Sequence, residues 1–364
     1  MDLDISPWLV LKSVNGVGNI LIKRLLEKFS CPEKIFSSSI NDLCLVEGMT
    51  KTKADAIKKA KETVFIKDEI NTALKENIKF IHYNHSDYPV LLKEIIDPPP
   101  FLYLLGEHPP DIVSIAVVGS RNAGAEGRAK ASNLSSVISK SGIRVTSGLA
   151  LGIDGASHSA ALNYHGSTTA VLGSGLLNLY PREHKALFKK IIDKKGAVFS
   201  EFFLNQPPDA YNFPRRNRIV SGLSIGVVVV EAGEKSGAVI TAKTAAEQGK
   251  EVFVVKLENT NSPGTEILCE LGAKKIVSAN DIFEEFPWLK IKVFEKPPEK
   301  KSLDFNEESV VKALKQSKIP LNIDEICRNL NLKYSNKVGA ALLNLELEGI
   351  IKQLPGKFYY LTED

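Results

Sequence analysis

Cysteine, methionine and tryptophan are scarce in this chain. Its 364 residues include four cysteines, two methionines and two tryptophans. The cysteines lie far apart and form no C-x-x-C pair, which argues against a zinc ribbon and against a disulfide framework. This distribution favours a protein of a reducing compartment.

Long apolar segments and a targeting sequence are also missing. Apolar runs such as Val227–Val230 are far shorter than the roughly 20 residues of a membrane-spanning helix. The N-terminus starts with the acidic segment Met1–Asp4 and not with basic residues followed by an apolar stretch. We therefore expect a cytoplasmic protein with no membrane partner.

No part of the chain carries a large excess of charge of one sign. The net charge is +4, and residues 111–285 contain 20 basic and 17 acidic side chains. A large duplex-binding surface would need a much stronger basic excess. A nucleic-acid partner would therefore have to meet a local concentration of positive charge.

Residues 1–75 have helical periodicity interrupted by two glycine turns. Val14–Gly18 places an apolar-Gly-apolar-Gly turn between two helical patterns, and Leu45–Thr50 repeats it with Thr50 in place of the closing glycine. Such turns are typical of a SAM-like helix-hairpin-helix domain, in which glycines let backbone N–H groups approach a phosphate. The alternative is a pair of tight turns that only pack the helices together.

Residues 76–290 begin with a connector and continue as alternating strand and helix patterns. The connector, 76–110, contains two proline clusters and should lie along an edge of the following sheet. Beyond it, strands that are apolar throughout alternate with helices, which predicts an α/β fold with an extended Rossmann-like, doubly wound parallel sheet. The expected strands are Ile112–Val118, Ile143–Thr146, Thr168–Leu172, Ala197–Phe199, Gly226–Val230 and Glu251–Val255. The expected helices are Glu126–Lys140, Ile153–Tyr164, Glu183–Lys194 and Ala238–Gln248.

A charged, proline-containing linker at 291–305 leads to a third block at 306–364. Three short helical patterns and two strand patterns around Pro355-Gly356 predict a winged helix. Residues 297–364 contain 10 basic and 10 acidic side chains, which favours a protein-contact or regulatory role over duplex reading.

Glycine and serine follow most of the predicted strands. Because parallel strands end at one edge of a sheet, these turns should bring backbone N–H groups together as an anion cradle. The G-x-G-x-x-G fingerprint and the P-loop are both absent, so no nucleotide cofactor is expected. The turns in question are Gly119–Arg121, Ser147–Asp154, Gly173–Gly175 and Glu231–Gly237.

Arginine is densest in Phe213–Arg218, where three arginines follow a proline at a predicted helix start. Guanidinium groups in this arrangement suit several backbone phosphates. The alternative is a structural ion-pair network with Glu201 or Glu231. One or two of the nearby aromatic side chains would stack on bases; the candidates are Tyr180, Phe202, Phe203, Tyr211 and Phe213.

Catalytic constellations are poorly developed. His158 lies on an apolar helix face, as core histidines do, and Asp154 stands where it can cap a helix. There is no H-E-x-x-H and no G-x-S-x-G. We therefore expect no enzyme and no metal site.

Five segments of the sequence, in their order along the chain, resemble motifs of the DNA-processing protein A family (DprA, also called Smf). Two departures affect local loops: His184 stands where the family usually has Asn, and Lys256-Leu257 where it usually has Pro-Gly. The matching segments are Val117–Arg121, Ser147–Asp154, Tyr180–Glu183, Phe213–Gly222 and Ser236–Ala242.

The resemblance implies a bacterial cytosolic protein that binds single-stranded DNA on its Rossmann-like domain and forms a homodimer through that domain. It further implies protection of incoming DNA, loading of the RecA recombinase during natural transformation and recombination, and no catalytic activity. The DNA-contacting residues that it implies are Gly119, Ser120, Arg121, Gly173, Ser174, Gly175, Lys185, Arg216, Asn217, Arg218, Ser236, Gly237 and Lys243.

A nucleotide-binding hydrolase is the alternative. Related Rossmann-like proteins cleave nucleoside monophosphates, and Pro263–Glu266 superficially resembles their phosphoribohydrolase signature, although it follows the sixth strand and lacks the doubled glycine.

Overall fold

A computed structural model describes residues 5–164, 167–258, 260–289, 305–317, 320–330, 335–347, 350–354 and 357–361. The chain divides into two compact units, Met1–Glu295 and Lys296–Asp364. The predicted linker, except Phe305, and the predicted Pro355-Gly356 turn lie outside the described residues.

Among the described residues, the first unit begins with six helices, four of which form two helical hairpins. Val14–Gly18 joins α1 to α2, and Leu45–Thr50 joins α4 to α5. Gly16 and Gly48 have φ values of +78° and +84°, a left-handed conformation that favours glycine in each turn. The helices are α1 (Ser6–Ser13), α2 (Asn19–Phe29), α3 (Pro32–Ser37), α4 (Ile40–Cys44), α5 (Lys51–Lys59) and α6 (Val64–Lys75).

Nine strands of the described residues form the central sheet, in the order β1-β2-β6-β5-β4-β3-β7-β8-β9. The seven strands from β6 to β9 in this order run parallel, whereas β1 and β2 are antiparallel to their neighbours at one edge. The strands are β1 (Lys79–His82), β2 (Phe101–Gly106), β3 (Ser114–Val118), β4 (Arg144–Ser147), β5 (Thr168–Val171), β6 (Ala197–Ser200), β7 (Gly226–Val229), β8 (Glu251–Val255) and β9 (Lys274–Ile276).

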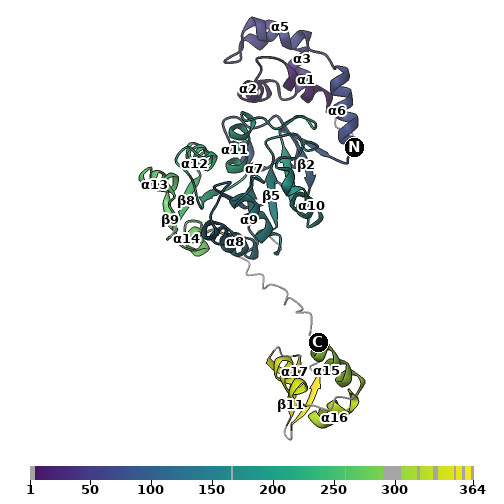
Figure 1. The fold of residues 1–364 in the computed structure, drawn as a ribbon. Coiled ribbons are helices and arrows are strands. Elements are labelled where there is room, and N and C mark those ends of the chain that lie inside the picture. Colours follow the sequence, from purple (N-terminus) through teal and green to yellow (C-terminus); the bar gives the residue numbers. More distant parts are fainter. Residues whose placement is uncertain are drawn as a thin grey trace. The chain divides into compact units, whose positions relative to one another are not determined.

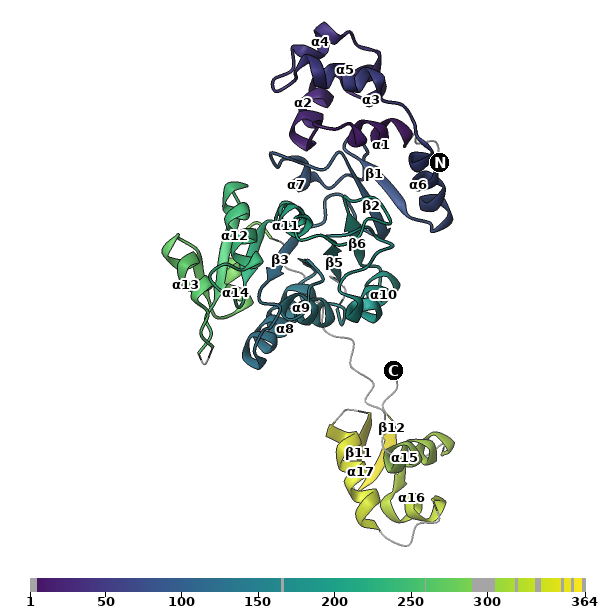
Figure 2. The same cartoon turned by 45° about the horizontal axis from the view of Figure 1, so that its top comes forward.

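Helices cover both faces of this sheet. In β3, Ile115 and Val117 pack with α8, α9 and α14, while Ala116 and Val118 pack with α11, α12 and α13 on the other face. Figure 2 shows α8 and α9 on one side of the strands and α11 and α12 on the other. The helices are α7 (Val90–Lys93), α8 (Ala125–Lys140), α9 (Ile153–Ala161), α10 (Lys185–Asp193), α11 (Asn212–Gly222), α12 (Gly237–Glu247), α13 (Pro263–Glu270) and α14 (Ala279–Glu284).

The helical hairpins and the β1-β2 edge of the sheet share one hydrophobic core. Phe101 and Tyr103 of β2 belong to the same buried cluster as Trp8, Leu25 and Ile66 of the N-terminal helices. Figure 1 shows these helices gathered beside α7 and β2. The connector thus forms the sheet edge expected of it, and its two strands attach the helical hairpins to the sheet.

The second unit has a hydrophobic core of its own, around Val310, Leu342 and Ile351. Its strands pair in the order β10-β12-β11, and three helices pack against them. The elements are α15 (Phe305–Gln316), β10 (Leu321–Asn322), α16 (Ile323–Asn329), α17 (Ser335–Leu347), β11 (Ile351–Leu354) and β12 (Phe358–Leu361). The α/β prediction, with a helix-hairpin-helix block and a winged helix, is confirmed.

Candidate nucleic-acid interface

A cavity of about 670 Å³ lies beyond the carboxyl ends of β3, β4 and β7. The strand order reverses at β3, which is the place where doubly wound sheets bind ligands. We call this cavity the cradle. The predicted site residues that line it are Gly119, Ser120, Arg121, Arg216, Asn217, Ser236 and Gly237.

The turn after β3 carries an exposed cation of the cradle. The turn is fixed by the Ser120 N–H, which donates to the Glu231 carbonyl at 2.6 Å. A Cβ at Gly119 would lie 2.6 Å from the Ile153 side chain, so this glycine allows close packing of the turn against α9. The exposed Arg121 guanidinium lies 5.1 Å from the centre of the Phe213 ring.

The N-terminus of α12 forms the second wall. Ser236 caps this helix by accepting a hydrogen bond from the Val239 N–H, and the Asn217 side chain donates to the Gly237 carbonyl at 3.2 Å. The positive end of the helix dipole therefore faces the cradle, beside the exposed Lys235.

The third wall depends on a buried arginine. Arg216 is 4% exposed, and its guanidinium donates to the carbonyls of Gly148 and Val171. Burial lowers the pKa of Arg216 to about 10, against the effect of Asp154, so it stays charged at neutral pH. Among the described residues that line the cradle, Asp154 is the one acid. It is buried and accepts from two backbone N–H groups, at Gly148 and Ala150.

The three arginines of Phe213–Arg218 point in different directions. Helix α11 begins at Asn212, two residues before the predicted start, so all three lie inside the helix. Successive helical residues are about 100° apart, and residues three apart share a face. Arg216 therefore faces the cradle, whereas Arg215 and Arg218 line a separate groove.

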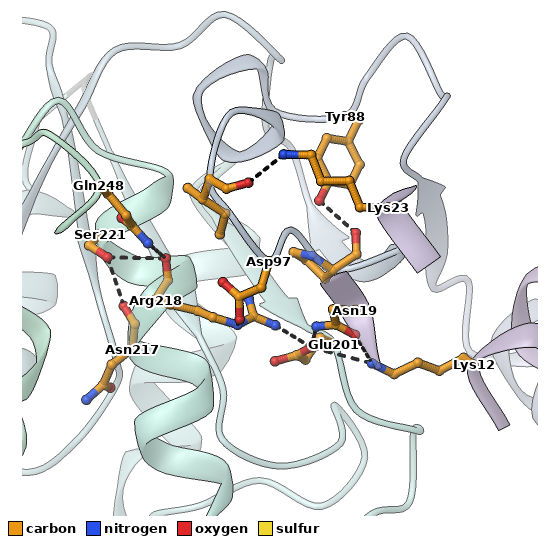
Figure 3. A network of polar contacts seen from close by, with 12 residues as sticks. Lys12, Asn19, Lys23, Tyr88, Asp97, Glu201, Asn217, Arg218, Ser221 and Gln248 are labelled. Carbon is orange, nitrogen blue, oxygen red and sulfur yellow. Dashed lines mark hydrogen bonds and ion pairs between the residues drawn. The ribbon is translucent and has the colours of Figure 1, made fainter. Parts of the chain in front are cut away.

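Arg218 is held by carboxylates. Its Nη2 lies 2.7 Å from Glu201 and its Nε lies 2.8 Å from Asp97. Glu201 also accepts from the Asn19 side chain at 3.2 Å and lies 3.8 Å from Lys12 Nζ, as Figure 3 shows. The ion-pair alternative thus holds for Arg218 with Glu201. Glu231, in contrast, accepts from the Gly124 N–H.

Burial and the charges of this network shift the pKa values of its two carboxylates, Glu201 and Asp97. Burial by itself would raise the pKa of Glu201, but the charges of Arg218 and Lys12 outweigh it and lower that pKa. Burial raises the pKa of Asp97, which Arg218 only partly offsets. Glu201 is therefore ionised at neutral pH and holds α11 to the first helical hairpin.

Several of the predicted residues lie outside the cradle. The turn after β5 is covered, because a Cβ at Gly173 would contact the Phe213 ring and one at Gly175 would contact the Phe203 carbonyl. Ser174 is 1% exposed. Lys185 and Lys243 are exposed but do not line the cavity, so their DNA contacts stay predictions.

The aromatic candidates separate by exposure. Phe202 is buried and Phe203 is half-buried against the core, whereas Tyr211 is 83% exposed at the start of α11 and Tyr180 is 44% exposed. Phe213 lines the cradle. Its ring supports both Arg121 and Arg216, at 5.1 and 5.9 Å.

The residues considered for catalysis take structural positions. His158 is fully buried and its Nδ1 lies 2.7 Å from the Thr168 hydroxyl, as expected for a core histidine. Asp154 holds the turn before α9. Pro263–Glu266 begins α13 and does not line the cradle. The Gly264 N–H in this segment donates to the Ala232 carbonyl. The described residues contain no cluster of three or more metal-ligating side chains.

Two residues that shape the cradle, Lys235 and Gly148, were not among the site residues predicted from the sequence. Lys235 lies in a turn that was singled out for its glycines, and a lysine beside a helix start is the signal that identifies it. Gly148 matters through the space it leaves, since a Cβ there would lie 2.5 Å from Arg216 Nη2. Sequence spacing carries no signal for that contact.

Comparison with known proteins assigns the chain to a family. The family model described as DNA recombination-mediator protein A matches residues 79–287, over the whole central sheet. The chain belongs to the DNA-processing protein A family. Models of a SAM-like helix-hairpin-helix tandem and of the DprA winged helix domain match residues 9–61 and 294–357.

Similar DprA family proteins match most of the chain. A Protein Smf from Synechocystis is 32% identical over 97% of both chains, and the DNA processing protein DprA of Bacillus subtilis is 42% identical over 58% of this chain and 73% of its own. The crystal structure of Streptococcus pneumoniae DprA matches with a TM-score of 0.67 and 30% identity, covering 78% of this chain and 99% of that one. A structure described by its single-stranded DNA binding mode, DprA of Helicobacter pylori, matches with a TM-score of 0.53 and 26% identity, covering 58% and 96%. No described helix of the present chain is long and apolar enough to cross a bilayer.

Proposed function

We propose that the chain binds single-stranded DNA in the cradle and acts as a recombination mediator without catalysing a reaction. The observation that carries the proposal is the charge of the cradle. Arg121 and Lys235 are exposed in it beside the N-terminus of α12, whereas Arg216 and Asp154, the one acid among its described lining residues, are both buried. Such a site neutralises backbone phosphates and has few groups that read bases.

The site also suits a flexible strand. The exposed Tyr211 and Tyr180 offer rings on which unpaired bases stack without sequence preference. The Helicobacter pylori relative, a structure described by its single-stranded DNA binding mode, supports the same class of ligand.

Within the DprA family setting, we further propose that the DNA-bound chain protects incoming strands and loads RecA onto them in the bacterial cytoplasm, as a homodimer through the Rossmann-like unit. Sedimentation of the chain alone tests the dimer. The rate of RecA assembly on a labelled oligonucleotide, with and without the chain, tests the loading. A chain that leaves this rate unchanged would restrict the proposal to DNA binding.

Arg121→Ala tests the cradle itself. We expect the affinity for oligothymidylate to fall about tenfold at low salt, and the slope of log affinity against log salt to drop by about 0.7, the value of one lost phosphate contact. Fluorescence anisotropy over a salt series measures both. Lys75→Ala, which removes an exposed charge at the end of α6, is the control. If both variants bind alike, the cradle is not the binding site.

The hydrolase alternative has a direct assay. Incubation with nucleoside monophosphates and detection of free base would reveal it, and release of base that depends on Thr265 and Glu266 would overturn the non-catalytic proposal.

A further inference from the structure

A second cavity, of about 870 Å³, lies on the other side of α11. We call it the hairpin groove, because the two helical hairpins form one wall and α11 with α12 form the other. Pro214 and Ile240 line both the hairpin groove and the cradle, so the two cavities adjoin across these side chains.

The hairpin groove carries an excess of positive charge. Five basic side chains line it against three acidic ones. Arg24 is paired with Glu47, Arg218 with Asp97 and the buried Glu201, and Lys12 lies 3.8 Å from Glu201. The exposed Arg215 and the half-buried Lys53 have no described carboxylate within ion-pair distance, and Lys53 Nζ donates to the Gly48 carbonyl at 2.9 Å. The groove thus keeps cations that are free to meet an anion.

One wall of the groove is a helix end without a side-chain cap. Gly18 is the N-cap of the eleven-residue helix α2 and supplies no acceptor for its first N–H groups. In α5 and α6, by contrast, the side chains of Thr50 and Thr63 accept such hydrogen bonds. A Cβ at Gly18 would meet nothing within 4 Å, so the space in front of α2 is open.

A buried donor provides an independent sign of a missing acceptor. Arg218 is 6% exposed and lines the groove, and its Nη1 has no hydrogen-bond partner among the described residues. Its Nε and Nη2 are used by Asp97 and Glu201. Figure 3 shows this guanidinium between the two carboxylates. A buried guanidinium N–H without an acceptor is unfavourable, and an anion in the groove would satisfy it.

We propose that the hairpin groove is a second segment of the single-stranded DNA path. The strand leaves the cradle over Pro214 and Ile240, which is 42% exposed, and lays its next phosphates against the N-terminus of α2, Arg215 and Lys53. A flexible single strand can bend across α11, whereas the charge excess of the groove, which falls from two to one once Glu201 is counted, is small for a duplex. This inference rests on the proposed function of the cradle.

Gly18→Asp tests the path in the full chain. The substitution suits an N-cap with φ of −82° and gives α2 the capping acceptor it lacks, while placing a carboxylate where a phosphate would lie. Thr63→Asp is the matched control, since it puts the same charge at the N-cap of α6, outside both cavities. The probes are two oligothymidylates. The shorter, of about 6 nucleotides, fits within one typical binding site for single-stranded DNA, and the longer, of about 20 nucleotides, extends beyond it.

We expect Gly18→Asp to weaken binding of the longer oligonucleotide about tenfold and to leave the shorter one within about twofold. Arg215→Ala should show the same dependence on length, and Thr63→Asp should bind both probes as the wild type does. Equal weakening of both lengths, no weakening of either, or weakening of a duplex alone would overturn the path. Failure of the wild-type chain to bind the shorter probe would instead overturn the proposed function, and the path with it.

Discussion

At the scale of single residues, Glu201 connects parts of the chain that are far apart in sequence. It is 2% exposed and meets Arg218 of α11 together with Lys12 and Asn19 of the first hairpin, the last 182 residues away. A buried carboxylate with several cationic partners fixes the relative position of the elements that carry them. The contact between the hairpin and α11 therefore depends on one charge.

Glu201→Gln removes that charge. We expect the free energy of unfolding to fall by about 3–5 kcal/mol at neutral pH, because Arg218 and Lys12 are left buried with fewer partners. Urea denaturation followed by circular dichroism measures it. Glu76→Gln, an exposed carboxylate at the end of α6, should change stability by less than about 0.5 kcal/mol. A loss below 1 kcal/mol at position 201 would show that the network does not hold the hairpin.

The same residue predicts a dependence on pH. Its pKa is lowered in the folded protein, so its stabilising contribution is present above the ordinary glutamate value of about 4.3 and is lost as the pH falls through the lower folded value. The stability difference between wild type and Glu201→Gln should therefore be largest near neutral pH and shrink below about pH 4. Denaturation midpoints across this range test the sign, and a difference that grows on acidification would contradict it.

At the scale of elements, α11 divides the arginine cluster between two sites. The helical rotation sends Arg216 to the cradle and Arg215 with Arg218 to the hairpin groove. The turn after β4 makes room for this arrangement, because Gly148 leaves the space that the Arg216 guanidinium fills. The geometry of the cradle thus depends on a glycine that need not itself touch a ligand.

Gly148→Ala tests that dependence. The added methyl group would lie 2.5 Å from Arg216 Nη2, and we expect a loss of about 1–3 kcal/mol of stability through overpacking. Affinity for oligothymidylate should fall as well, since Arg216 and Arg121 share the Phe213 ring. Gly233→Ala is the control, because a Cβ there meets nothing within 4 Å. Equal stability and affinity in the two variants would contradict this role for Gly148.

At the scale of the whole molecule, each of the two compact units has its own core. The residues of the winged helix bury a separate cluster around Val310 and Ile351, and the first unit contains both the cradle and the hairpin groove. The first unit therefore contains every part of the proposed strand path.

A chain that ends at Glu295 should keep its affinity for single-stranded DNA. We expect a change of less than about threefold, because the removed residues 296–364, with 11 basic and 10 acidic side chains, add little net phosphate neutralisation. Titration of the truncated and full chains with the same oligothymidylate, and with a duplex, measures it. A tenfold loss for the single strand would place part of the binding surface in the winged helix.

The sequence by itself determined the order and class of the elements. Apolar runs alternating with helical periods predicted six of the parallel strands and the helices between them, because periodicity is a local property of the chain. It missed the antiparallel pairing of β1 with β2, whose short apolar runs carry no mark of direction, and it placed the start of α11 at Pro214 instead of Asn212.

Only the tertiary structure decided what the arginines do. The sequence placed Arg215, Arg216 and Arg218 together along the chain and offered Glu201 or Glu231 as a possible partner of the cluster. It did not show that Glu201 and Asp97 are brought to Arg218 by packing, or that the ring of Phe213 covers Gly173. A local pattern fixes which groups are near each other in sequence and on which face of a helix they lie. Which of them stay free for a polyanion depends on the partners that distant segments bring, and those partners are set by the packing of the whole unit.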